Sequence, residues 1–153
     1  MDKEWREVMN KTEFKELIER VKSKNPRIFG LDSDMKPSIK DIELTEQYYS
    51  IVFLESYKEF LLLYGGGYFG FTAVYSLDPN SPFFMKNNVS VEFLNTNKLF
   101  PVIDFETGDL ACFKVDNGIC KDWMMLYNHE EKTISEMKMN FYDTLAKYAL
   151  KWE

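Results

Sequence analysis

The alternation of apolar and polar residues predicts a helix, a glycine stop and a strand between residues 53 and 71. Apolar side chains recur there at the spacing of one helix face, at Tyr57, Phe60, Leu61 and Tyr64. Gly65 follows directly, and glycine most readily takes the left-handed conformation in which many helices end. Beyond the glycines, residues 68–75 alternate as in a half-buried strand. We therefore expect a structural corner, where an amphipathic helix is followed by one aromatic strand.

A helix with a change of phase is predicted near the N-terminus, over residues 4–23. Within it, Asn10 followed by Glu13 forms a capping-box pattern, which indicates that a new helix begins there. Pro26 ends the element, because the residue before a proline disfavours the helical conformation. Residues 27–37 have the composition of a loop.

A second helix is predicted from Ser38 to about Tyr49, because Ser38 and Asp41 have the spacing of an N-terminal cap. After the aromatic strand, residues 78–82 are a dense cluster of turn formers. Residues 83–97 allow two interpretations. Their apolar residues alternate as in a strand, whereas their polar content suits a short helix or a loop.

The C-terminal half contains three further strands, which are expected at residues 100–105, 110–115 and 119–127. The chain turns at Gly108 and again at Asn117-Gly118, which is the strongest short hairpin signal in the sequence. After a polar break, residues 133–152 are predicted to form one helix. Helices before and after a block of strands predict an α+β fold rather than alternating βαβ units.

Composition indicates a globular protein. We treat the 153 residues as a single domain, 1–153, which is long enough to bury a core. An aromatic content of 16% excludes disorder, and the longest apolar run, residues 60–74, is too short to cross a bilayer. The charged N-terminus lacks the apolar core of a signal peptide. We therefore expect a cytoplasmic protein that does not enter a membrane.

The net charge restricts the partners. Acidic residues outnumber basic ones by 25 to 19, which gives a net charge of −6. Binding to nucleic acid requires a basic surface, so we expect no direct nucleic-acid contact. An acidic surface is compatible with docking onto a basic protein, because complementary fields speed encounter. Mild acidity that serves only solubility remains the alternative.

The sequence contains no recognisable catalytic motif. The glycines at 65–67 lack the preceding strand and the following Lys-Ser/Thr of a phosphate-binding loop, so a helix cap is the favoured interpretation. His129 is the only histidine, and nothing in the sequence places Ser135 or an orienting carboxylate beside it. We expect no enzyme, no cofactor and no metal site.

Cys112 and Cys120 flank a predicted hairpin turn and could lie on neighbouring strands. The expected cytoplasmic location favours reduced thiols over a disulfide. Neither cysteine belongs to a Cys-x-x-Cys motif or to a Cys/His cluster of the kind that binds zinc.

Acidic residues gather at two turns of the strand region: Asp104, Glu106 and Asp109 at one, and Asp116 at the next. Their order does not match a calcium-binding loop. A solvated acidic rim is the favoured interpretation. Since this is the most concentrated negative feature of the predicted sheet, these four residues are our candidates for partner binding.

The order of these motifs resembles the SUKH superfamily, the Smi–Knr type domain of fungal cell-wall-synthesis regulators and many bacterial immunity proteins. The segments that carry the resemblance are Ile42-Glu43-Leu44-Thr45-Glu46, Phe53-Leu54, Ser56-Tyr57, Phe60-Leu61, Gly65-Gly66, Leu99-Phe100-Pro101-Val102, Thr107-Gly108-Asp109, Tyr127-Asn128-His129-Glu130 and Asn140-Phe141. The chain departs from the family pattern at three positions. Ser50 stands where glycine is common, Leu54 where proline is usual, and Asn140 where the family has serine.

The resemblance covers about residues 39–150, and residues 1–36 are less distinctive. It implies a twisted, mainly antiparallel sheet of about six strands, flanked by N-terminal and C-terminal helices. It further implies an immunity protein, which binds a cognate toxin domain, often a nuclease, and neutralises it without a cofactor. A regulatory or scaffold interaction domain of the Smi–Knr type is the alternative. The sequence leaves the oligomeric state and the identity of the toxin open.

Overall fold

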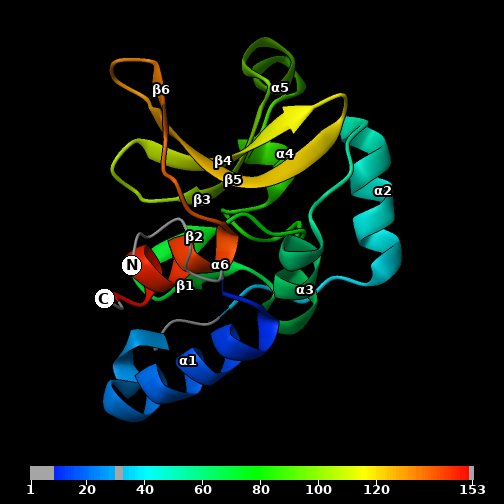
Figure 1. Cartoon of the computed structure of the whole chain (residues 1–153). Coiled ribbons are helices and arrows are strands. Elements are labelled where there is room, and N and C mark those ends of the chain that lie inside the picture. Colours follow the sequence, from blue (N-terminus) through cyan, green and yellow to red (C-terminus); the bar gives the residue numbers. More distant parts are fainter. Residues whose placement is uncertain (1–8, 30–32, 152–153) are drawn as a thin grey trace.

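The computed structural model describes residues 9–29 and 33–151, and it shows an α+β fold built on one antiparallel sheet (Figure 1). The sheet has six strands in the order of the sequence: β1 (Gly67–Phe69), β2 (Thr72–Val74), β3 (Leu99–Asp104), β4 (Asp109–Asp116), β5 (Ile119–Asn128) and β6 (Thr133–Glu136). The α-helices are α1 (Lys11–Lys24), α2 (Ile39–Tyr49), α3 (Glu55–Tyr64), α4 (Met85–Asn88), α5 (Val91–Asn97) and α6 (Phe141–Thr144). The predicted fold class and sheet are confirmed.

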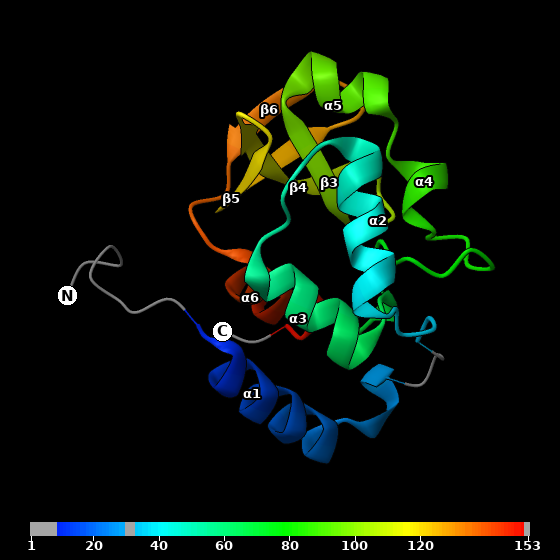
Figure 2. The same ribbon diagram turned by 90° about the vertical axis from the view of Figure 1, so that its right-hand side faces the viewer.

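The helices form layers on the sheet. In two views related by 90°, α3 and α6 lie between the larger strands and α1, while α2 stands at the side of the molecule (Figures 1 and 2). The ring of Phe141 on α6 lies 5.6 Å from the rings of Tyr57 and Phe60 on α3. It also lies 5.6 Å from the ring of Phe113 on β4. These fully buried aromatic rings form the centre of the core.

The predicted helix caps are confirmed. At the start of α1, the side chain of Asn10 accepts a hydrogen bond from the amide of Glu13 at 2.9 Å, and the carboxylate of Glu13 accepts one from the amide of Asn10 at 3.2 Å. Ser38 and Asp41 form the same reciprocal box at the start of α2. The first part of the helix predicted from residue 4 lies outside the described residues, as do residues 30–32 of the predicted loop.

The glycine stop is confirmed, and the structure adds a second reason for it. Gly65, Gly66 and Gly67 all have positive φ, between 80° and 93°. The loop that precedes α2 lies against them, and the amide of Asp34 donates to the carbonyl of Gly66 at 2.9 Å. A Cβ atom on Gly67 would lie 2.5 Å from Oδ1 of Asp34. The glycines therefore end α3 and also allow a loop to approach closely.

The prediction of one aromatic strand over residues 68–75 is wrong. The chain turns back at Gly70-Phe71, so that β1 and β2 form a short hairpin with Tyr68 opposite Ala73. Gly70 has a φ of +58° and lies against the carbonyl of Ala149, which accepts a hydrogen bond from the amide of Phe71 at 2.9 Å. The C-terminal segment of the chain thus fixes a turn that the local pattern of alternation does not reveal.

The prediction of one helix over residues 133–152 is also wrong in its first part. Thr133–Glu136 forms β6, which pairs with β5. The helix begins only at Asn140, whose side chain caps the amide of Asp143 at 2.8 Å, and it continues from α6 as a π-helical turn, Leu145–Ala149. Residue 152, the last of the predicted helix, lies outside the described residues.

The ambiguous residues 83–97 form the two short helices α4 and α5. Ser90 caps α5 by accepting a hydrogen bond from the amide of Phe93 at 3.0 Å. The predicted hairpin at Asn117-Gly118 is present, since β4 and β5 pair up to Asp116 opposite Ile119 and both turn residues have positive φ.

Candidate partner-binding surface

Three of the four predicted partner-binding residues lie at the β3–β4 turn. Asp104 is half-buried, and its carboxylate accepts hydrogen bonds from the hydroxyl of Tyr75 at 3.2 Å and from the amide of Glu106 at 2.7 Å. Glu106 is exposed, and Asp109 is partly exposed. The carboxylate of Asp104 is thus occupied in holding the turn, whereas Glu106 faces solvent.

The β5–β6 turn lies beside the β3–β4 turn, because Asp109 pairs with Asn128 in the sheet. It brings Glu130 and Glu131, both exposed, to the same end of the molecule. Together these form a surface that we call the acidic rim: Glu106, Asp109, Glu130 and Glu131. Glu130 and Glu131 were not among the predicted site residues, and pairing of the two predicted hairpins would have identified them.

The fourth predicted residue, Asp116, does not join the acidic rim. It lies at the far end of β4, eight residues long, so it is about 23 Å from Asp109 at the usual rise of a strand. Asp116 is exposed and begins the β4–β5 turn, which lies next to the C-terminal end of α2 (Figure 1).

A groove of about 440 Å³ lies between α2 and the β4–β5 turn. We call it the α2 groove, and its side chains include Glu43, Glu46, Gln47, Val52, Lys58 and Ile119. The segment after α2 is hydrogen-bonded to the turn. The amide of Val52 donates to the carbonyl of Gly118 at 2.7 Å, and the amide of Cys120 donates to the carbonyl of Val52 at 3.0 Å.

The two carboxylates of the α2 groove differ in their surroundings. Glu46 is mostly buried, accepts a hydrogen bond from the amide of Phe53 at 2.8 Å and forms an ion pair with Lys58 at 3.4 Å. Glu43 is exposed, one turn earlier on α2. Glu46 therefore belongs to the scaffold, and Glu43 belongs to the surface.

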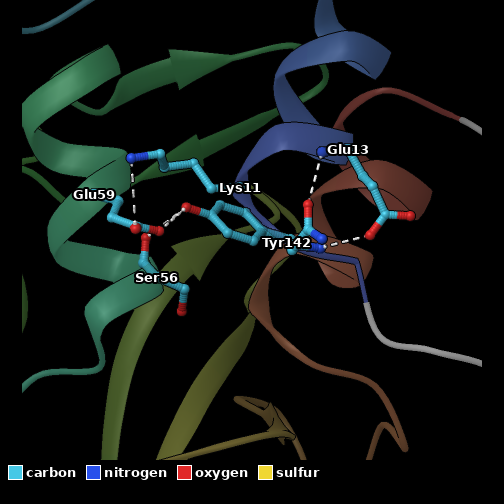
Figure 3. Close-up of polar contacts among 6 residues, drawn as sticks. Lys11, Glu13, Ser56, Glu59 and Tyr142 are labelled. Atoms are coloured by element: carbon cyan, nitrogen blue, oxygen red, sulfur yellow. Dashed lines mark hydrogen bonds and ion pairs between the residues drawn. The ribbon is translucent and has the colours of Figure 1, made fainter.

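A polar cluster joins α1, α3 and α6 (Figure 3). The hydroxyl of Tyr142 donates to Glu59 at 2.9 Å and contacts the carbonyl of Ser56 at 3.1 Å, and Lys11 reaches Glu59 from α1 at 3.9 Å. Burial, followed by the nearby Glu59 carboxylate, raises the pKa of Tyr142. The Ser56 hydroxyl is buried and has no hydrogen-bond partner in the described part of the chain. This cluster joins α6 to α3, with Lys11 of α1 at its exposed edge.

Among the described residues, the two cysteines and the histidine do not converge on a site. Cys112 and Cys120 are both free and buried, and they lie opposite Met125 and Val115 rather than opposite each other. Burial raises the pKa of Cys120 to about 12, so its thiol stays protonated and unreactive at neutral pH. His129 is exposed. Over residues 9–29 and 33–151, no three His, Cys, Asp or Glu side chains are grouped so as to hold a metal ion.

None of the helices in the described ranges is both long enough and apolar enough to cross a membrane.

A family model described as SMI1-KNR4 cell-wall, SUKH_6, matches residues 39–145, which is more than half of the chain. The matched region begins with α2 and contains the whole sheet, whereas α1 lies outside it. A search of curated proteins gives no match.

Proposed function

The chain belongs to the SMI1-KNR4 (SUKH) family, and we propose that it is an immunity protein that binds a cognate toxin and neutralises it. The observation that carries this proposal is the family match over residues 39–145, which contains α2 and every strand of the sheet. The role that the resemblance implies for bacterial members is protein binding. The protein would then act by covering a surface of the toxin and would need no catalytic residue of its own.

The charge of the chain favours a basic toxin, and we propose a nuclease. Nucleases bind the phosphate backbone through basic surfaces, which an acidic protein can cover in place of the substrate. The net charge is −6, and the acidic rim presents the exposed carboxylates of Glu106, Glu130 and Glu131 at one end of the sheet. These charges would speed the encounter with a basic partner.

A regulatory or scaffold interaction domain without a toxin partner is the second candidate. The description of the matching family model, which names the cell wall, favours it. The neighbouring genes distinguish the two candidates. A large toxin gene with a variable C-terminal region beside this gene supports immunity, whereas genes of wall synthesis in that place support regulation.

Co-expression tests the proposed function. The C-terminal domain of the toxin encoded beside this gene is expressed alone, with this protein, and with an unrelated acidic protein of similar size as a control. We expect growth to be restored only by this protein, and we expect the two proteins to purify together. A toxic domain that stays toxic and does not co-purify with this protein would refute the proposal.

A further inference from the structure

The α2 groove has the properties of a pocket for a cationic side chain. We propose that a lysine or arginine side chain on the toxin inserts between α2 and the β4–β5 turn when the two proteins bind. The inference rests on the proposed function, and it assigns a short-range contact to a surface that lies at the opposite end of β4 from the acidic rim.

The walls of the groove are apolar and fixed in place. Val52 and Ile119 are 51% and 46% exposed, which is unusual for two aliphatic side chains that lie next to each other. The backbone of Val52 is hydrogen-bonded to Gly118 and to Cys120, the two residues that flank Ile119. Such walls suit the aliphatic stem of a lysine or arginine, which packs on apolar surface while its charged end reaches a polar group.

Polar side chains that are free to bind surround these walls. The exposed side chains of Glu43, Gln47 and Asn117 form no hydrogen bond or ion pair with any residue that the structure describes. Glu46, in contrast, is bonded to Phe53 and Lys58. The carboxylate that is available to a partner is therefore that of Glu43, with two amide groups beside it.

The charge balance selects a cation as the occupant. The ammonium of Lys58 lies 3.4 Å from both Glu46 and Glu55, so its charge is compensated within the chain. Glu43 remains uncompensated, and Asp116 lies next to the turn residues of the groove. A phosphate or an acidic side chain would be repelled. A second copy of this chain, with a net charge of −6, would meet repulsion as well.

The groove and the acidic rim would act at different ranges. Exposed charges such as those of the rim mainly change the association rate, whereas a cation that is paired with a carboxylate and packed against apolar walls slows dissociation. Arginine anchors in well-packed pockets are frequent hot spots of protein interfaces. We therefore expect the α2 groove to set the dissociation rate of the complex and the acidic rim to set its association rate.

Two substitutions test the groove in the complex. The probe is the catalytically inactivated C-terminal domain of the toxin encoded beside this gene, and affinity and dissociation rate are measured by surface plasmon resonance. We expect Glu43→Lys and Ile119→Lys each to weaken binding about tenfold or more, mainly through faster dissociation. Glu16→Lys on α1 changes the net charge by the same amount as Glu43→Lys and serves as the control, and its affinity should match that of the wild type. Thermal unfolding verifies that all three variants are folded.

The outcomes separate this inference from the proposed function. If the wild-type protein does not bind the toxin domain, the proposed function fails. If the wild type binds and neutralises the toxin while both groove variants bind equally well, the groove inference alone is wrong.

A probe that needs no toxin completes the test. Amide chemical shifts of the intact protein are followed while millimolar Gly-Arg-Gly, with blocked termini, is added, and Gly-Glu-Gly is the control. We expect the arginine peptide to shift residues 43–52 and 117–119, and we expect the glutamate peptide to shift neither. Equal shifts with both peptides, or none with either, would overturn the inference. So would a dimer of the free protein that Glu43→Lys abolishes, because the groove would then belong to a second copy.

Discussion

The carboxylate of Glu46 accepts a hydrogen bond from the backbone amide of Phe53 at 2.8 Å. This bond ties the last turn of α2 to the segment that leads into α3, and Lys58 on α3 lies 3.4 Å from the same carboxylate. Leu54 begins α3 without a side-chain cap, at the position where the family pattern usually has proline. Glu46 therefore holds the end of α2 to the start of α3. Its side chain belongs to the scaffold, whereas that of Glu43 is exposed on the surface.

Glu46→Ala is expected to destabilise the protein by about 1–3 kcal/mol, because it leaves the Phe53 amide without an acceptor and Lys58 without a buried partner. Glu43→Ala, on the exposed side of the same helix, should change the free energy of unfolding by less than about 0.5 kcal/mol. Denaturant unfolding measures both. Equal losses for the two variants would contradict the assignment of Glu46 to the scaffold.

Gly67→Ala is expected to cost more stability than Gly108→Ala. Both glycines have positive φ, at +80° and +97°, so both substitutions carry a backbone cost of about 1 kcal/mol. A Cβ on Gly67 would also lie 2.5 Å from Oδ1 of Asp34, whereas the nearest atom to a Cβ on Gly108 is 3.7 Å away. Thermal unfolding of the two variants makes the comparison. A similar loss of stability in both would show that the loop containing Asp34 moves away from the new Cβ atom at little cost.

Charge changes at the β3–β4 turn should separate folding from binding. Asp104→Ala is expected to lower stability by about 1–3 kcal/mol, because the Tyr75 hydroxyl and the Glu106 amide lose their acceptor. Glu106→Lys combined with Glu130→Lys should leave the fold intact and slow association with a basic toxin, more strongly at low salt. Unfolding and stopped-flow binding are the measurements. An unchanged association rate at low salt would remove the acidic rim from the interface.

Stability should fall in alkaline solution. Burial raises the pKa of Tyr57 well above its ordinary value of 10.0, and its hydroxyl donates to the carbonyl of Tyr75 at 2.7 Å. The native state therefore holds this proton more tightly than the unfolded chain does. The associated stability is present below pH 10 and is lost as the pH rises above it.

The variant Tyr57→Phe isolates this contribution. At neutral pH it should cost about 1 kcal/mol for the lost hydrogen bond. Above the ordinary tyrosine pKa, the free energy of unfolding of Tyr57→Phe should fall less steeply than that of the wild type, by up to about 1.4 kcal/mol per pH unit. If the free energy of unfolding fell equally steeply with pH in both proteins, the assignment of Tyr57 as a buried proton donor would be wrong.

The sequence predicted those parts of the fold that depend on neighbouring residues. The capping boxes at Asn10 and Ser38, the stop at Gly65 and the turn at Asn117-Gly118 are each specified within a few positions, and each is present. The helix phase of residues 57–64 also identified the buried face of α3, where Tyr57, Phe60 and Leu61 are fully buried.

The errors arose where distant segments decide the structure. β6 forms because Thr133–Glu136 extends the hairpin of β5, although all four of its residues are exposed and their pattern is weak. The β1–β2 turn depends on the carbonyl of Ala149, nearly eighty positions further along the chain. The candidate surfaces depend in the same way on strand pairing, which brought Glu130 to the same end of the sheet as Asp109 and placed Asp116 at the far end of β4.

Titration of toxin activity with the purified protein tests the central claim most directly. The substrate-cleaving activity of the toxin domain encoded beside this gene is measured while this protein is added at about physiological salt. We predict that the activity falls linearly and is abolished near equal concentrations of the two proteins, as expected of a tight stoichiometric inhibitor. Full activity in the presence of excess protein would contradict the assignment of this chain as an immunity protein.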